Sequence, residues 1–360
     1  MKNSNVILKT VLNVLIALIA LGLYVLAIVN AYGLYNGNLL VYAVLLVAGA
    51  ILSTFIYSLV HELGHLIAGL IAGLKFSKIC VLIFLLELEN EKLKFKLVKP
   101  TEFGYTEMLP KHQKDYGEKL AVSATGGLVF SVLIALASMA VCINNLENVY
   151  MFTLFGASYP LALYIFFVNA LPFFNSSDGA LIFSILAEDK NSALKNYYSV
   201  MASVLTGVEP GEIKQGQLEI FNDKPYSQNL KYIKYLHYLN TDFDKAYEYI
   251  LNLSKSQIID DDLYFIVKKE IFFCKAVLGD EGFIEENAFN IVGDIDVSDD
   301  LCNYRVHATY RIFIKDYKVA GLILKNGVDV LSKKAQNGFV KSELKYLKDL
   351  QNQLNNLESL

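Results

Sequence analysis

Long runs of apolar residues fill the first half of the chain and predict membrane-spanning helices. Residues Val11 to Val29 carry no charge, and at about 1.5 Å per residue they are long enough to cross a hydrocarbon core of roughly 30 Å. Further apolar runs cover Leu39–Leu74, Leu120–Ile143, and the stretch from Val149 through Pro160 towards Phe174. We therefore expect about four transmembrane helices. The second run would measure about 54 Å as a single helix, so it must tilt, bend or leave the bilayer.

The pattern changes from helix to strand between the second and third apolar runs. Ile79–Leu88 is rich in β-branched and large apolar residues, and Lys92–Leu97 alternates with a period of two, with Asn90-Glu91 between them. This pattern predicts a membrane-associated β-hairpin within region 75–119. The first strand is too apolar to face water on both sides, so we expect it to lie against the protein at the bilayer edge.

The distribution of lysines predicts which side of the membrane each segment occupies. Region 75–119 carries nine lysines, whereas the short connections 31–38 and 144–148 carry none. Because positively charged loops remain in the cytosol, we expect a multi-pass integral membrane protein with its amino terminus and its carboxyl-terminal domain in the cytosol. The first apolar run is long and lacks a clear cleavage site, so we interpret it as a retained helix rather than a signal peptide.

The last part of the chain is polar and has the rhythm of packed helices. Asp242–Ala246 and Asp316–Ala320 each occupy a helix-turn-helix position, and Gly279–Phe283 lies about midway between them. The spacing is similar to that of tetratricopeptide-like repeats of about 34 residues with insertions. Helical repeats of this kind bind peptides or proteins, so a protein partner on the helical tail is a hypothesis.

These patterns together predict the fold class and the domain organisation. We expect a polytopic α-helical membrane protein with about four transmembrane helices and a membrane-associated β-hairpin, followed by an all-α helical-repeat soluble domain. Residues 1–38 would form an amino-terminal helix with a short external loop, and residues 39–207 the membrane core. Residues 208–360 would form the cytosolic helical domain.

Composition and charge narrow the classes of function. The chain is 54% hydrophobic and 19% charged, and its mean hydropathy is +0.38, which argues against an ordinary soluble enzyme. Residues 1–208 hold 13 of the 32 basic and 12 of the 36 acidic residues, so the charge is concentrated in the tail. The only arginines are Arg305 and Arg311. No basic stripe could neutralise phosphates, so we expect no nucleic acid partner and only membrane lipid around the apolar segments.

An HExxH motif lies within the second apolar run. His61 and His65 are four residues apart, so their imidazoles share one helical face and can bind a single metal ion. Glu62 adjoins them and can take a proton from a metal-bound water. Zinc is the metal that best suits imidazole and carboxylate ligands with one position left for water. The pattern therefore indicates metal-assisted hydrolysis.

A purely structural role for this motif is the alternative. An ionisable residue inside a membrane span costs at least about 2.5 kcal/mol on insertion scales when it is charged and central, and it needs a partner. A His-Glu pair could provide that partner as a helix-packing contact. Such a pair leaves His65, the second histidine, unexplained.

A zinc site needs a third protein ligand, and Asp178 is the leading candidate. It is the one acid between Val149 and Ala187, and a glycine follows it, which we expect to let the backbone pack closely against the ligand helix. The alternative for Asp178 is a helix N-cap, although Ser176 or Ser177 could cap instead. The other histidines are better explained by ordinary surface or core roles; they are His112, His237 and His307.

The motifs and their order resemble the site-2 protease family of intramembrane zinc metalloproteases. His61-Glu62-Leu63-Gly64-His65 is followed by Asn169-Ala170-Leu171-Pro172 and then by Asp178-Gly179, and the resemblance covers about residues 39–190. It implies that His61, His65 and Asp178 bind Zn²⁺ and that Glu62 activates water. It also implies that Asn169 and Pro172 shape an unwound segment facing the substrate, and that the hairpin presents substrate as an added strand.

The chain departs from the family pattern at three places. Five residues separate Pro172 from Asp178 where four are common, and Ser177 replaces the usual leucine before Asp-Gly. Ala124-Thr125-Gly126-Gly127, with Phe130, stands where many members have Ala-Gly-Pro and then asparagine. These differences concern the local loop shape rather than the ligand set. There is also no recognisable PDZ insertion.

The leading hypothesis is an intramembrane zinc metalloendopeptidase. Its substrate would be the transmembrane segment of a small membrane protein, or a leader or signal peptide. The alternative is a membrane-anchored scaffold that recruits partners through its helical tail and carries a vestigial metal site. A transporter fits less well, because the sequence has no inverted repeat and no second charged pathway.

Overall fold

The chain forms two compact units. A computed structural model describes residues 2–34, 38–89, 92–99, 104–144, 148–152, 155, 159–172, 177–187, 193–218, 227–255, 261–297 and 300–358. The first unit comprises residues 1–111 and 115–190, and the second comprises 112–114 and 191–360.

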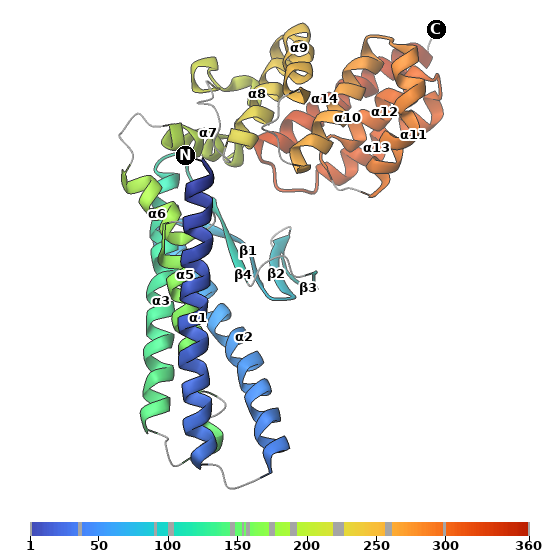
Figure 1. Ribbon diagram of the computed structural model, residues 1–360. Helices are drawn as coiled ribbons and strands as arrows, with labels where there is room; N and C mark the ends of the chain where they lie inside the picture. The colour runs from blue at the N-terminus through green and yellow to red at the C-terminus, as the bar shows by residue number, and fades with distance from the viewer. Residues whose placement is uncertain are drawn as a thin grey trace. The chain divides into compact units, whose positions relative to one another are not determined.

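The first unit is a helical bundle with a small sheet beside it (Figure 1). Among the described residues, three helices are long and apolar enough to cross a membrane, over Thr10–Val29, Leu39–Ile71 and Tyr116–Asn144. They belong to α1 (Lys2–Leu34), α2 (Leu39–Ile71) and α3 (Tyr116–Asn144). Large apolar side chains lie exposed along all three, such as Leu40 and Leu133. Such a surface is typical of segments surrounded by lipid.

The second apolar run ends as a helix earlier than its composition suggests. Helix α2 stops at Ile71, and Gly73 adopts a left-handed φ of 85° while its N–H donates to the carbonyl oxygen of Leu70. A glycine in this conformation is a common end to a helix. The run does leave the helix, because Leu74 is already the first residue of strand β1. At 33 residues α2 is still about 50 Å long.

Four antiparallel strands form a sheet in the order β3-β2-β1-β4. The strands are β1 (Leu74–Val81), β2 (Phe84–Glu89), β3 (Lys92–Leu97) and β4 (Gly104–Pro110). The predicted hairpin is present as β2 and β3, paired from Phe84 with Leu97 to Glu89 with Lys92. Its expected turn, Asn90-Glu91, lies outside the described residues.

The prediction of one strand over Ile79–Leu88 is wrong. The chain reverses at Leu82, whose φ is 54°, so that Val81 pairs with Phe84 and the segment forms the end of β1 and most of β2. No glycine, asparagine or aspartate marks this turn in the sequence, so its apolar run resembles one continuous strand. Strand β4 was not anticipated.

The described residues of the fourth apolar run form short helices. Helix α4 covers Val149–Met151 and α5 covers Tyr159–Ala170, followed by α6 over Asp178–Ala187. The twelve residues of α5 rise only about 18 Å, less than a hydrocarbon core of roughly 30 Å. Helix α5 contacts α1 and α3, and α6 contacts α3. This arrangement packs α6 against α3 and α5.

The second unit is all-helical, as expected. After α7 (Ala193–Leu205) come two short 3₁₀ helices, η2 (Pro210–Glu212) and η3 (Gln215–Leu218). Seven longer helices follow: α8 (Ser227–Thr241), α9 (Phe243–Ser254), α10 (Asp261–Val277), α11 (Glu281–Val297), α12 (Asn303–Phe313), α13 (Tyr317–Leu331) and α14 (Gly338–Glu358). Helices α8 and α9, α10 and α11, and α12 and α13 pack as pairs.

Each pair turns at one of the three segments that the sequence singled out. Asp242 begins α9 and accepts a hydrogen bond from the N–H of Lys245, and Asp316 begins α13 and accepts one from Val319. Asp280 accepts one from Phe283 at the start of α11. The three aspartates (242, 280 and 316) are helix caps, and each begins the second helix of a packed pair.

The two units divide between residues 190 and 191, ahead of the boundary expected at 207–208. Helix α7 is amphipathic, and it packs Val200 and Val204 into a core with Ile213, Leu218 and Ile233. The helix therefore belongs to the second unit by its contacts.

Candidate metal centre

Three side chains from two helices converge on one point in the first unit. The Nε2 atoms of His61 and His65, both on α2, are 3.1 Å apart. Asp178 lies at the start of α6. Its Oδ2 is 3.2 Å from Nε2 of His61, and its Oδ1 is 3.4 Å from Nε2 of His65. All three residues predicted as ligands are therefore brought together, from segments more than a hundred residues apart.

The contact distances among these four atoms are close to the ligand spacing of a tetrahedral zinc site. Zinc binds imidazole nitrogen and carboxylate oxygen at about 2.0–2.2 Å, which places tetrahedral ligands about 3.4 Å from one another. The observed contacts of 3.1, 3.2 and 3.4 Å are close to that separation. Three protein ligands also leave a fourth position for water or substrate, as catalytic zinc sites do.

Helix α3 orients both imidazoles. Nδ1 of His61 lies 3.0 Å from the carbonyl oxygen of Gly127 and 2.8 Å from Oγ of Ser131, and Nδ1 of His65 lies 3.0 Å from the carbonyl oxygen of Ser123. A carbonyl can only accept a hydrogen bond, so Nδ1 carries the proton in each ring. In the neutral tautomer both Nε2 atoms then present lone pairs to the shared point, as in metal-binding histidines.

The described residues around Asp178 do not fully satisfy the hydrogen-bonding capacity of its carboxylate. Its side chain is only 14% exposed, and its Oδ2 is buried without a partner that meets hydrogen-bond geometry among the described residues. A buried carboxylate oxygen facing two nitrogen lone pairs is unfavourable unless a cation lies between them. The donor set therefore fits a divalent metal.

The capping alternative for Asp178 is resolved by Ser177. Oγ of Ser177 accepts a hydrogen bond from the N–H of Ala180 at 3.2 Å and donates one to the carbonyl oxygen of Leu171 at 2.8 Å. The serine thus caps α6, which leaves the carboxylate of Asp178 directed at the histidines. Serine at the position where leucine is usual in the family has a local structural reason.

Glu62 is buried beside the cluster, and its carboxylate accepts a hydrogen bond from the sheet. Thr106 of β4 donates to its Oε2 at 2.7 Å, and a Cβ on Gly104 would lie 2.8 Å from its Oε1. Glu62 is 4% exposed. Thr106 and Gly104 were missed in the sequence, because no motif marks β4 as a neighbour of α2.

Glycines allow α2 and α3 to cross at very short distance. A Cβ on Gly64 would lie 2.5 Å from the carbonyl oxygen of Gly126, and one on Gly127 would lie 2.5 Å from Nε2 of His65. Gly126 and Gly127 form the segment that departs from the family pattern. Their role here is to let the backbone of α3 reach the imidazoles.

The expected role of Gly179 needs a correction. A Cβ there would lie 1.9 Å from the carbonyl oxygen of Ala170, at the end of α5, rather than against the ligand helix α2. The glycine is required, but for the close contact between the start of α6 and the end of α5. That contact helps to position Asp178.

A cavity of about 480 Å³ opens onto the cluster. Its walls come from α2, β4, α3, α5 and α6, and they include Glu62, Tyr105, Tyr164 and Asn169. The Nδ2 group of Asn169 donates to the carbonyl oxygen of Ile165 one turn earlier. Pro172 follows the end of α5, is exposed, and is not among the residues that line the cavity.

The remaining histidines lie apart from this cluster. Nδ1 of His237 contacts the carbonyl oxygen of Pro210, and Nε2 of His307 accepts from Arg311. His112 is exposed in the turn before α3. Within the described residues, the only group of three or more metal-ligand side chains is His61, His65 and Asp178.

Comparison with known proteins adds no family to this geometry. No family model, no curated protein and no solved structure matches the chain.

Proposed function

We propose that the chain is an intramembrane zinc endopeptidase of the kind that the site-2 protease family represents. One observation carries the proposal: two imidazoles and a carboxylate converge at contact distances of 3.1–3.4 Å, beside a buried glutamate, in a cavity among apolar helices. Its substrate class is the transmembrane segment of a small membrane protein, or a leader or signal peptide.

The residues of the chain have distinct roles in this proposal. His61, His65 and Asp178 hold the zinc, which when bound polarises a carbonyl and lowers the pKa of a water molecule. Glu62 takes the proton of the attacking water and delivers it to the leaving amine. Thr106 fixes one oxygen of the Glu62 carboxylate.

Strand β4 is the element that suits substrate presentation. It is an edge strand, and its residues Gly104, Tyr105 and Thr106 line the cavity beside Glu62, whereas the lysine-rich strand β3 lies at the opposite edge of the sheet. A substrate added as a strand along β4 would expose its backbone next to the general base. Asn169 lines the same cavity, whereas Pro172 would act only by ending α5.

The membrane arrangement follows from the lysine pattern and the three long helices. The apolar run from Val149 towards Phe174 would supply a fourth crossing, which places the amino terminus and the helical unit in the cytosol. The paired helices of that unit offer a surface for a protein partner.

The direct test is Glu62→Gln in a reconstituted assay with a single-span substrate. General-base catalysis contributes about 10²–10⁴-fold, so we expect cleavage to fall by at least 100-fold while zinc content stays at one per chain. A wild-type level of cleavage in this variant would remove the assigned role of Glu62.

Metal content separates this proposal from the scaffold alternative. Protein purified in mild detergent should contain one zinc per chain by elemental analysis, and His65→Ala should contain none. A chain that binds no zinc while remaining folded would favour a scaffold. The two imidazoles would then share a proton across their 3.1 Å contact.

A further inference from the structure

Ser58 is a buried serine in the wall of the metal cavity. It lies on α2 one turn before Glu62 and is only 4% exposed. Among the described residues, no group forms a hydrogen bond with its hydroxyl. Thr54, one turn earlier, also lines the cavity, but its hydroxyl donates to the carbonyl oxygen of Ala50 at 2.7 Å. Because buried hydroxyls are normally hydrogen-bonded, Ser58 is suited to bind a polar group that enters the cavity.

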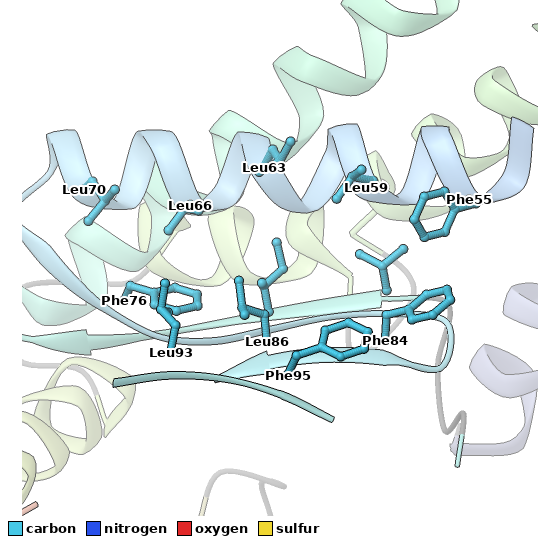
Figure 2. A pocket seen from close by; sticks show the side chains of 12 residues that line it. Phe55, Leu59, Leu63, Leu66, Leu70, Phe76, Phe84, Leu86, Leu93 and Phe95 are labelled. Atoms are coloured by element: carbon cyan, nitrogen blue, oxygen red, sulfur yellow. The ribbon is translucent and has the colours of Figure 1, made fainter. Parts of the chain in front are cut away.

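The polar groups of α2 that surround the metal centre lie on one side of the helix. The stripe that faces the sheet is entirely apolar (Figure 2), and it consists of Phe55, Leu59, Leu63, Leu66 and Leu70. At about 100° per residue, Ser58 lies between Glu62 and His65 around the helix axis. Its hydroxyl therefore belongs to the same face as the proposed base and the metal ligands.

Strand β4 indicates where a substrate strand would meet this face. The hydroxyl of Thr106 lies 3.1 Å from the backbone carbonyl oxygen of Glu62 and 2.7 Å from its Oε2, so this face of β4 lies against α2. Neighbouring strands direct their paired side chains to the same face of a sheet. A strand added at the free edge of β4 would therefore direct every second side chain towards α2.

The spacing along α2 matches the spacing along such a strand. Ser58 and Glu62 are one turn apart, which is about 6 Å along the helix. Successive side chains on one face of a strand are about 6.6–6.8 Å apart. A Cβ on Gly69 would lie 2.9 Å from the side chain of Met108, so β4 runs in the same direction as α2, and Ser58 lies towards the Gly104 end. A substrate side chain beside Glu62 thus has its next neighbour on the same face at Ser58.

The charges of the cavity select an uncharged side chain for this position. No lysine or arginine is among the described residues that line the cavity, and its two acids are Glu62 and Asp178, the proposed base and a metal ligand. A charged side chain would therefore be buried without a counter-ion of its own. An aliphatic side chain would leave the hydroxyl of Ser58 without a partner. A hydroxyl both donates and accepts, as Ser58 does, so it satisfies both limits.

We propose that Ser58 is a specificity-determining residue that binds the side chain of a serine or threonine in the substrate, two residues from the position beside Glu62. The inference rests on the proposed function, because it takes the substrate to lie in the same cavity. In a transmembrane helix, a serine or threonine hydroxyl bonds to a carbonyl of its own helix. Unwinding of the substrate breaks that bond, and Ser58 supplies the replacement.

The test compares threonine with valine, which has the same shape without the hydroxyl. A set of fluorescent single-span peptides carries one threonine, or one valine in its place, at successive positions. Each peptide is titrated with the full Glu62→Gln chain, loaded with zinc in mild detergent, and binding is measured by fluorescence anisotropy. We expect one position at which threonine binds at least about tenfold more tightly than valine. Adding Ser58→Ala should lower that ratio to about twofold or less.

Ser138→Ala is the matched control. Ser138 is a buried serine on α3 whose Oγ lies 2.8 Å from the hydroxyl of Tyr57, and it does not line the cavity. This variant should keep the preference for threonine, and equal zinc content in all variants shows that the site is folded. If Ser58→Ala weakens the threonine and valine peptides equally, Ser58 contacts the backbone or serves packing, and the proposal is overturned.

Cleavage of the same peptides by the wild-type chain separates this inference from the proposed function. Peptides that are cleaved without a Ser58-dependent preference at any position would overturn the specificity site and leave proteolysis supported. A Ser58-dependent preference in binding, without cleavage, would support the site and contradict proteolysis. Absence of such a preference at every position overturns the site whether or not the peptides are cleaved.

Discussion

The two units bury charged groups in opposite ways. In the helical unit, Arg305 is fully buried and its guanidinium donates to both carboxylate oxygens of Glu270 and of Glu343, at 2.9–3.0 Å. The hydroxyls of Tyr232 and Tyr235 donate to Glu270 as well. In the first unit, the carboxylate of Asp178 faces the imidazoles of His61 and His65, and neither lysine nor arginine belongs to this group of described residues.

This difference distinguishes a cluster whose charges are balanced by protein groups from a cluster whose donor set fits a cation. The cluster around Arg305 contains both hydrogen-bond donors and acceptors, so protein groups alone satisfy its charges. Cζ of Arg305 also lies 4.3 Å from the ring centroid of Phe273. The cluster around Asp178 presents lone pairs and a carboxylate to one another, and no described residue offers Oδ2 a partner that meets hydrogen-bond geometry. Buried polar groups are normally satisfied, so such a set is suited to holding a cation.

The largest effect on stability should come from removing Arg305 from its cluster with Glu270 and Glu343. Arg305→Leu would leave two carboxylates buried without their cation, and breaking a buried ion pair costs about 3–5 kcal/mol. Urea unfolding of the full chain, followed by hydrogen exchange in α10, α12 and α14, measures the loss. Replacing Arg305, Glu270 and Glu343 together by leucine should recover much of it. Unchanged protection in Arg305→Leu would show that the cluster contributes little.

Substitution in the cluster of His61, His65 and Asp178 should change stability in the opposite direction. Asp178→Asn removes a buried negative charge that faces two nitrogen lone pairs, so we expect the metal-free variant to be at least as stable as the metal-free wild type. Zinc affinity should fall by at least about 100-fold, the upper end of what loss of an outer-shell partner costs. At zinc 100-fold above its Kd, the wild type gains about 2.7 kcal/mol, and the variant should gain none.

Thermal unfolding with and without zinc measures both parts of that prediction. Asp329→Asn, at an exposed position on α13, is a control for loss of charge. A metal-free Asp178→Asn chain that unfolds far below the wild type would mean that the carboxylate serves the fold.

A smaller effect is expected at the contact between Glu62 and the sheet. Hydrogen bonds to charged groups are worth about 1.5–3 kcal/mol, so Thr106→Val should lower turnover by roughly 10–100-fold with zinc content unchanged. Thr106→Ser keeps the hydroxyl and should restore most of the activity. A serine variant as slow as the valine variant would assign Thr106 a packing role only.

The smallest effect concerns the pH dependence of the helical unit. Burial raises the pKa of Glu343 above its ordinary value, although Arg305 opposes the rise. Between the pKa of Glu343 in the unfolded state and its higher pKa in the folded state, the folded protein binds a proton that the unfolded protein has released. The free energy of unfolding therefore falls as the pH rises through this range. One such proton changes stability by at most about 1.4 kcal/mol per pH unit.

Urea midpoints of the helical unit between pH 4.5 and 7 test this sign. Glu343→Gln cannot titrate, so its profile should be flatter than that of the wild type over this range. Parallel profiles for the two proteins would exclude Glu343 as the source of the slope.

Periodic patterns predicted the elements whose structure depends on local sequence. The three long apolar helices, the pairing of β2 with β3 and the helix starts at Asp242 and Asp316 all have signals within a few residues. The turn at Leu82 has none, because its residues are apolar and its left-handed φ of 54° is set by strand pairing. Strand β4 is likewise defined by its pairing with β1.

The sequence by itself determined which side chains can bind a metal: the spacing of His61 and His65 puts them on one helical face, and Asp178 is the one acid in its apolar run. Only the tertiary structure decided that they meet. The glycines of α3 and Gly179 bring distant backbones into contact, and Ser177 frees the carboxylate by capping α6. Such contacts depend on how helices pack, and packing joins residues that no local pattern links.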